Sequence, residues 1–178
     1  MFASGRGFRF CTDVTVRFSE TDAQGVAHNA VYLVWFEIAR VDYLARFDGG
    51  YPALRAQGVE ATTTESYVRY RAPARFADEL RVYACCRDLR GARFRFEYVI
   101  ERVHPPPSGS PETSAPAEAL VAEGWTSHAC LDARTLRPTR MPAWLADAIS
   151  DAESSDESSR PRGSRRPAAP GRGVSPAG

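Results

Sequence analysis

Residues 20–40 decide the fold, and they read ETDAQGVAHNAVYLVWFEIAR. Asp22 and Gly25 come shortly before an apolar run over residues 30–47. Apolar side chains leave only a narrow polar stripe along this run, which predicts a helix that other parts of the fold cover on most sides. The glycines in residues 48–50 predict its end, because glycine readily adopts the left-handed conformation that closes many helices.

This stretch also places a carboxylate beside the start of a helix. The first backbone N–H groups of a helix have no partner within the helix and can hold a developing negative charge. Asp22 could instead close a turn or cap the helix, for which aspartate is a preferred residue. It lies several residues before the helix, however, and a carboxylate next to such N–H groups supplies the parts that acyl transfer needs.

The rest of the chain is dominated by predicted strands. Residues 8–18 alternate between apolar and polar side chains with the period of two that is typical of a strand. Further strands are predicted over residues 62–70, 79–88, 93–103 and 120–132, and a short closing helix over 141–149. One strand, a long helix and four antiparallel strands predict an α+β fold in which a curved antiparallel sheet wraps around a long central helix.

Two separated segments resemble a known family. The pattern D-x-x-G-x-x-x-x-x-x-Y from Asp22 to Tyr32 is followed by F-E-x-A-R, and residues 70–82 follow Y-x-x-P-x-x-x-x-D-x-L-x-V. Both are similar to the 4-hydroxybenzoyl-CoA thioesterase branch of the hotdog-fold superfamily, over residues 14–144. The resemblance implies a hotdog fold and a cofactor-independent acyl thioesterase that converts an acyl-CoA or acyl-ACP thioester into free acid and thiol.

The resemblance also implies roles for individual residues. Asp22 is the catalytic carboxylate, either as nucleophile on the thioester carbonyl or as general base on water. Gly25 lets the backbone approach the thioester, and the N–H of Asn29 occupies the position that binds the thioester oxygen. His28 could orient water or bond to Asp22, or could be structural, and Tyr32 is expected in the pocket wall or the core. The pair His28-Asn29 departs from the commoner family pattern, which leaves the acyl carrier open.

A second carboxylate and two other functions of the same fold also fit parts of this sequence. Glu37 is a second candidate carboxylate, because another hotdog branch takes its carboxylate from the central helix. Arg40 follows three residues later, so a helix ion pair is the preferred interpretation. Two rival functions of the same fold remain: an acyl-thioester dehydratase or hydratase, which normally uses a helix-borne histidine, and a non-catalytic acyl-thioester-binding protein.

Arginine supplies every basic side chain, since the sequence contains no lysine. Coenzyme A presents a diphosphate and a ribose phosphate, and arginine is well suited to hold phosphates. The candidates at strand ends and connections are Arg69, Arg71, Arg75, Arg90 and Arg93. Arg90, in a predicted hairpin connection, has the most suitable position, and Arg71 is assigned to substrate binding with it.

Composition favours a soluble, cytoplasmic enzyme. The chain has 178 residues, a net charge of +1, 43% hydrophobic and 25% charged residues, which is ordinary for one globular domain. The charge gives no indication of nucleic-acid or membrane binding. The start of the chain lacks the apolar region of a secretory signal, and the four cysteines show no metal-ligand spacing. Cys85 and Cys86 are expected to be reduced packing residues on opposite faces of a strand.

The predicted domain organisation is a hotdog domain over residues 1–149 and a disordered tail over residues 150–178. The tail is rich in Ser, Pro and Arg and is nearly devoid of apolar side chains. A minority interpretation makes it a partner-binding arm. Residues 105–116 are expected to form a long mobile loop between two strands. A sheet with an unpaired edge invites pairing, so we expect a homodimer or homotetramer with sites between the subunits.

Overall fold

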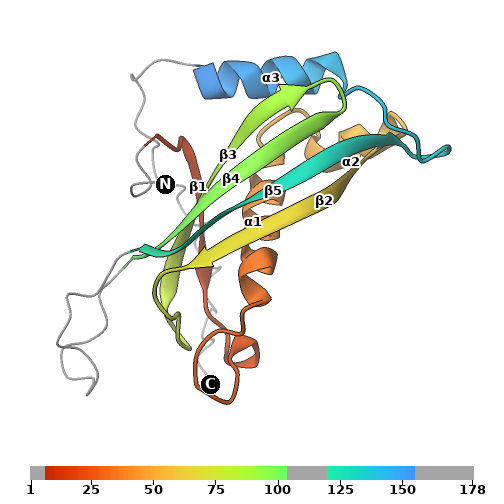
Figure 1. Ribbon diagram of the computed structural model, residues 1–178. Helices are drawn as coiled ribbons and strands as arrows, with labels where there is room; N and C mark the ends of the chain where they lie inside the picture. Colours follow the sequence, from red (N-terminus) through yellow and green to blue (C-terminus); the bar gives the residue numbers. More distant parts are fainter. Residues whose placement is uncertain (1–6, 104–119, 155–178) are drawn as a thin grey trace, which may run out of the picture.

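Five antiparallel strands form one sheet that curves around a long helix (Figure 1). The computed structural model describes residues 7–103 and 120–154. The strand order is β1-β3-β4-β5-β2. The strands are β1 (Phe10–Thr15), β2 (Val59–Tyr70), β3 (Glu79–Arg90), β4 (Arg93–Arg102) and β5 (Leu120–Asp132). The helices are the 3-10 turn η1 (Phe18–Glu20), α1 (Val31–Leu44), α2 (Gly50–Ala56) and α3 (Ala143–Ser154). This architecture confirms the predicted α+β hotdog fold.

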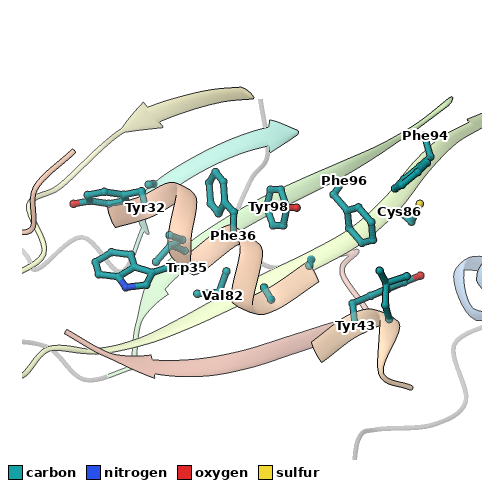
Figure 2. Close-up of a cluster of buried hydrophobic side chains, with 14 of the residues drawn as sticks. Tyr32, Trp35, Phe36, Tyr43, Val82, Cys86, Phe94, Phe96 and Tyr98 are labelled. Atoms are coloured by element: carbon teal, nitrogen blue, oxygen red, sulfur yellow. The ribbon is translucent and has the colours of Figure 1, made fainter. Parts of the chain in front are cut away.

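The core lies between α1 and the inner face of the sheet. Phe94, Phe96 and Tyr98 occupy alternate, inward-facing positions of β4, and Figure 2 shows them in a row opposite Phe36 and Tyr43 of α1. Phe36 stacks on Tyr98 with ring centroids 4.2 Å apart, and Tyr43 meets Phe96 edge-on at 5.2 Å. Such aromatic pairs stabilise a core by about 0.5–1.5 kcal/mol each beyond the area they bury. The apolar character of residues 30–47 therefore reflects burial against the sheet.

A glycine in β5 sets how closely the helix and the sheet approach. A Cβ at Gly124 would lie 2.3 Å from the carbonyl oxygen of Tyr67 and 2.7 Å from Cε2 of Phe36. Real Cβ atoms do not approach other atoms so closely, so no larger residue fits without moving the helix or the neighbouring strand. Gly124 thereby holds α1 against β5.

One flank of the molecule stays uncovered in the single chain. Leu33, Val34 and Val41 of α1 are 38%, 44% and 47% exposed, although the sequence predicted a helix covered on most sides. β2 is an edge strand, and its residues 62–67 are all exposed. The sheet of one chain covers only one side of α1, so the full covering expected from the apolar helix is not reached within one chain.

Two helices differ from the sequence prediction. The central helix ends at Leu44, before the predicted end near residue 47, and its C-cap is Ala45 in a right-handed conformation. The left-handed Gly49 (φ 76°) instead begins α2, a helix that was not predicted. α3 continues to Ser154 and does not end at Ile149, because Glu153 binds groups of α1 and β3 through its carboxylate. The ordered domain therefore extends beyond the predicted boundary at residue 149. The predicted loop over 105–116, and the predicted tail from residue 155 onward, lie outside the described residues.

The cysteines are packing residues, as expected. Cys85 and Cys86 are buried free thiols in β3, and of the two only Cys86 belongs to the cluster against α1. Burial raises the pKa of the Cys85 thiol to about 12, which keeps it protonated and unreactive at neutral pH. Among the helices of the described ranges, none is long and apolar enough to cross a membrane.

Candidate active site

The loop from Thr21 to Asn29 is closed at its base and tied to the body of the domain. Thr21 and Ala27 form an isolated antiparallel bridge across its base. The N–H of Ala27 also donates to the carbonyl oxygen of Ala74, in the connection between β2 and β3, at 2.8 Å. The loop is therefore held from two sides, and α1 begins two residues after Asn29.

Asp22 lies at the start of this loop. Its Oδ1 accepts a hydrogen bond from the N–H of Gln24 at 2.8 Å, and its carbonyl oxygen accepts one from the N–H of Gly25 at 2.9 Å. The turn role considered for Asp22 is thus real. It engages only one carboxylate oxygen: within residues 7–103 and 120–154, Oδ2 accepts no hydrogen bond from the protein. That oxygen is available for chemistry.

Gly25 forms the tight part of the turn. Its φ of +72° is a left-handed conformation that strains other residues, and a Cβ placed there would meet nothing within 4 Å. The glycine is required by the backbone conformation, and the space beside it is open. Both features agree with the expected close approach of a substrate.

The backbone N–H of Asn29 has no acceptor in the part of the chain that the structure describes. Its neighbours on both sides are engaged: the N–H of His28 donates to the carbonyl oxygen of Glu20 at 2.8 Å, and that of Ala30 donates to Nδ1 of His28 at 3.2 Å. The carbonyl of the same peptide unit, that of His28, accepts the N–H of Val31 at 2.9 Å, and Tyr70 Oη donates to the carbonyl oxygen of Asn29 in the next unit at 2.9 Å. The result is an oriented, unused donor just before α1.

The imidazole of His28 lies at this helix start and bonds to the backbone of the N-cap residue Ala30. Because Nδ1 accepts the Ala30 N–H, the neutral ring carries its proton on Nε2. Of the alternatives open in the sequence, the contacts favour a structural role, since within the described segments His28 makes no hydrogen bond to Asp22. The exposed ring keeps a donor for solvent or a ligand.

The other residues assigned to substrate binding fall into different environments. Tyr32 is 3% exposed, and its ring meets Tyr70 edge-on at 4.9 Å, so it belongs to the core beneath the loop. Burial raises the pKa of Tyr32, which keeps its hydroxyl neutral. Arg71 is ion-paired with the buried carboxylate of Glu123, so an anionic ligand would have to compete for it.

The expected ion pair of Glu37 is confirmed. Its Oε1 lies 3.4 Å from Nη2 of Arg40, and its side chain is 64% exposed on the surface of α1. A carboxylate this open to water is not held in place for attack on a substrate. Within the described residues, Arg40 is the one ion-pair partner of Glu37, so the Asp22 loop stays the preferred place for the catalytic carboxylate.

Arg90, the last residue of β3, lines a cavity of about 580 Å³. Two arginines of β4, Arg93 and Arg95, line the same cavity. The same cavity reaches Thr64 and Glu65 of β2. It lies at the opposite end of the strands from Tyr70 and Asn29, so one chain does not bring Arg90 to Asp22. Arg95 was missed in the sequence, although the period of two that joins it to Arg93 on the outer face of β4 could have identified it.

Arg95 also contacts an aromatic surface. Its guanidinium lies 4.4 Å from the ring centroid of Trp125, which in turn stacks on Tyr67 with centroids 6.0 Å apart. In the described part of the chain, no group of three or more His, Cys, Asp or Glu side chains could hold a metal ion.

Comparison with known proteins identifies the family. The thioesterase-like superfamily matches residues 16–149. The chain belongs to this family. It is 27% identical to the acyl-CoA thioester hydrolase YbgC of Escherichia coli O157:H7 over 129 residues, 72% of this chain and 87% of that protein. It is 33% identical to a putative esterase of Aquifex aeolicus over 85 residues, 48% of this chain and 66% of that protein.

Its fold matches that of a hypothetical protein, TT1821, from Thermus thermophilus. The TM-score is 0.65 at 35% identity, with 79% of this chain and 96% of that chain covered. The family confirms the expected class of enzyme, a thioester hydrolase.

Proposed function

We propose that the protein hydrolyses an acyl-CoA thioester, with Asp22 as the catalytic carboxylate and the N–H of Asn29 as the donor to the thioester oxygen. The unused Asn29 N–H carries the proposal, because it is a fixed donor at a helix start, a few residues after a carboxylate with a free oxygen. Donors held before the reaction stabilise charge that develops in the transition state, and losing one typically costs about 3 kcal/mol.

The reaction follows from these two groups. The thioester carbonyl oxygen accepts the Asn29 N–H while its carbon is attacked, either by Asp22 or by a water that Asp22 deprotonates. The carbon–sulfur bond then breaks and the thiol leaves with a proton. If Asp22 attacks, the acyl group forms an anhydride with its carboxylate, which water then cleaves to release the acid and restore Asp22; if water attacks, the free acid forms directly. Gly25 leaves room beside the turn for the thioester to approach.

The carrier is proposed to bind across two copies of the chain. Antiparallel pairing of two exposed β2 edges brings the Thr64 end of one strand beside the Tyr70 end of the other. The arginine cavity of one subunit would then lie next to the Asn29 loop of its partner, and its three guanidiniums suit the phosphates of coenzyme A. The exposed flank of α1 beside this edge supports a homodimer at least.

Replacing Asp22 with asparagine tests the assignment. Asparagine keeps an oxygen for the Gln24 N–H, so the turn should survive, but it neither attacks a carbonyl nor deprotonates water. We expect a fall in kcat/KM of at least about 100-fold, within the usual range for loss of a general base. Glu37→Gln is the matched control and should stay within a few-fold of the parent. A reversed ranking of the two variants would move the chemistry to α1.

The substrates in the assay separate the rival functions. Thiol release should be followed with aryl-CoA, aliphatic acyl-CoA and acyl-ACP thioesters, and loss or gain of water with enoyl and 3-hydroxyacyl thioesters. The helix α1 carries no histidine, which disfavours a dehydratase or hydratase. Binding of acyl-CoA without any turnover would instead identify a non-catalytic protein.

A further inference from the structure

Glu20 is a buried carboxylate directly before the Asp22 loop. Its side chain is 8% exposed, and both carboxylate oxygens accept hydrogen bonds from Arg17. Oε2 accepts the backbone N–H of Arg17 at 2.8 Å, and Oε1 accepts hydrogen bonds from the guanidinium, from Nη2 at 2.6 Å and from Nε at 3.1 Å. Trp35, a buried residue of α1 (Figure 2), helps to keep this carboxylate ionised. The hydrogen bonds of the Glu20 side chain thus close η1 onto Arg17.

The main chain of Glu20 also holds the base of the loop. Its carbonyl oxygen accepts the N–H of His28 at 2.8 Å, one residue after the Thr21–Ala27 bridge. Inside the bridge, the N–H of Asp22 donates to the carbonyl oxygen of Val26 at 2.9 Å. Asp22 lies on one side of this base, and the unused N–H of Asn29 follows on the other.

We propose that Glu20 is a positioning residue, which fixes the Asp22 carboxylate relative to the Asn29 N–H by closing η1 with its side chain and holding the loop base with its carbonyl oxygen. The inference rests on the proposed function for its kinetic consequence. A displacement of about 1 Å between reacting groups can reduce a rate about 100-fold, so an anchor of this kind acts on kcat without touching the substrate.

The charge of Glu20 belongs to this role. Burial alone would raise the pKa of Glu20, but the hydrogen bonds and the positive charge of Arg17 outweigh it and hold the pKa below its ordinary value. The group is therefore ionised at neutral pH and binds its donors as a carboxylate, and charge-assisted bonds of this type are stronger than neutral ones. Arg17 is 67% exposed, so its own position depends on Glu20.

Glu20→Gln tests the proposal, since it keeps the size of the side chain and places an amide against the Arg17 donors. We expect kcat to fall at least about tenfold, with KM changed less than about twofold. Hydrogen exchange at the amides of Asp22, Ala27 and His28 should accelerate, while exchange in β4 stays unchanged. The exposed substitution Arg17→Gln, which does not threaten folding, should give a smaller effect in the same direction.

Glu60→Gln is the matched control. Glu60 accepts hydrogen bonds from Arg55 Nε at 2.7 Å and from Tyr51 Oη at 2.7 Å, away from the loop base. This variant should keep the kcat of the parent. Equal losses of kcat in the Glu20 and Glu60 variants, or unchanged exchange at the loop base in Glu20→Gln, would overturn the proposal. If the parent hydrolyses no thioester, the proposed function fails, and hydrogen exchange still decides whether Glu20 anchors the loop.

Discussion

Replacing Glu153 with alanine should destabilise the fold strongly, although this residue lies near the end of the ordered chain. Its Oε1 accepts hydrogen bonds from Tyr43 Oη at 2.5 Å and from the N–H of Cys86 at 3.1 Å. Tyr43 is 1% exposed and Cys86 is 4% exposed, so water does not readily replace the lost acceptor. Oε2 lies 3.7 Å from Nη1 of Arg87, an exposed contact of little energetic value.

The magnitude follows from the two donors. Each buried donor left without an acceptor costs about 1–3 kcal/mol, so the alanine variant should lose about 2–6 kcal/mol of unfolding free energy. This loss is a large part of the unfolding free energy of a typical domain, which is roughly 5–15 kcal/mol. Glu153→Gln keeps an oxygen for both donors and removes only the charge opposite Arg87, so it should lose about 1 kcal/mol or less.

Urea unfolding followed by tryptophan fluorescence, at one protein concentration, measures these differences. A chain that ends at Ser150 lacks Glu153 and should be at least as unstable as the alanine variant. A chain that ends at Ser154 should match the full chain in stability and in kcat/KM, because it keeps the Glu153 contacts with Tyr43 and Cys86. If the alanine and glutamine variants unfold within about 0.5 kcal/mol of each other, the two hydrogen bonds do not hold α3 and the reasoning is wrong.

Two further predictions concern the inner face of β5. Gly124→Ala should cost at least about 1–3 kcal/mol, because its Cβ would overlap the Tyr67 carbonyl and the Phe36 ring; an unchanged urea midpoint would contradict this. Burial, reinforced by the charge of Arg40, lowers the pKa of His128 to about 3 in the folded protein. As the pH falls, His128 therefore becomes protonated in the unfolded chain before it does in the folded one. Stability should therefore fall by up to about 1.4 kcal/mol per pH unit from about pH 6.5 toward pH 3, and a His128→Gln variant should show a shallower fall.

The elements of the fold were largely predictable because their patterns are long and regular. β5 has the predicted bounds, and α1 lies within residues 30–47. α2 was missed because its seven residues are too few to show helical periodicity. The end of α3 was missed for a different reason. Glu153 extends the helix through hydrogen bonds with Tyr43 and Cys86, which are far away in sequence, so no local pattern indicates it.

The catalytic roles stay a prediction, but the local arrangement of the candidate residues could be expected from the sequence. Asp22, Gly25 and Asn29 lie within one short loop, so their order along the chain already implies their proximity. Arg71 is different, because its partner Glu123 is visible only once β2 and β5 are paired. Arg90 lies far from Asp22 within one chain, and sequence patterns carry no information on which distant surfaces meet between copies.

The order of the strands has a consequence for how the chain folds. β1 and β2 are successive strands, yet they occupy opposite edges of the sheet, while β3 and β4 are joined by a tight turn at Gly91. The β3–β4 hairpin is the most local pairing. The β2–β5 pairing joins strands that are separated in the sequence by both β3 and β4. Pairings between distant segments are slow to form, so β2 should be added late to a hairpin that is already in place. Lengthening the connection between β4 and β5 adds little to this cost, since closure entropy grows only about 0.6 kcal/mol for each doubling of a loop.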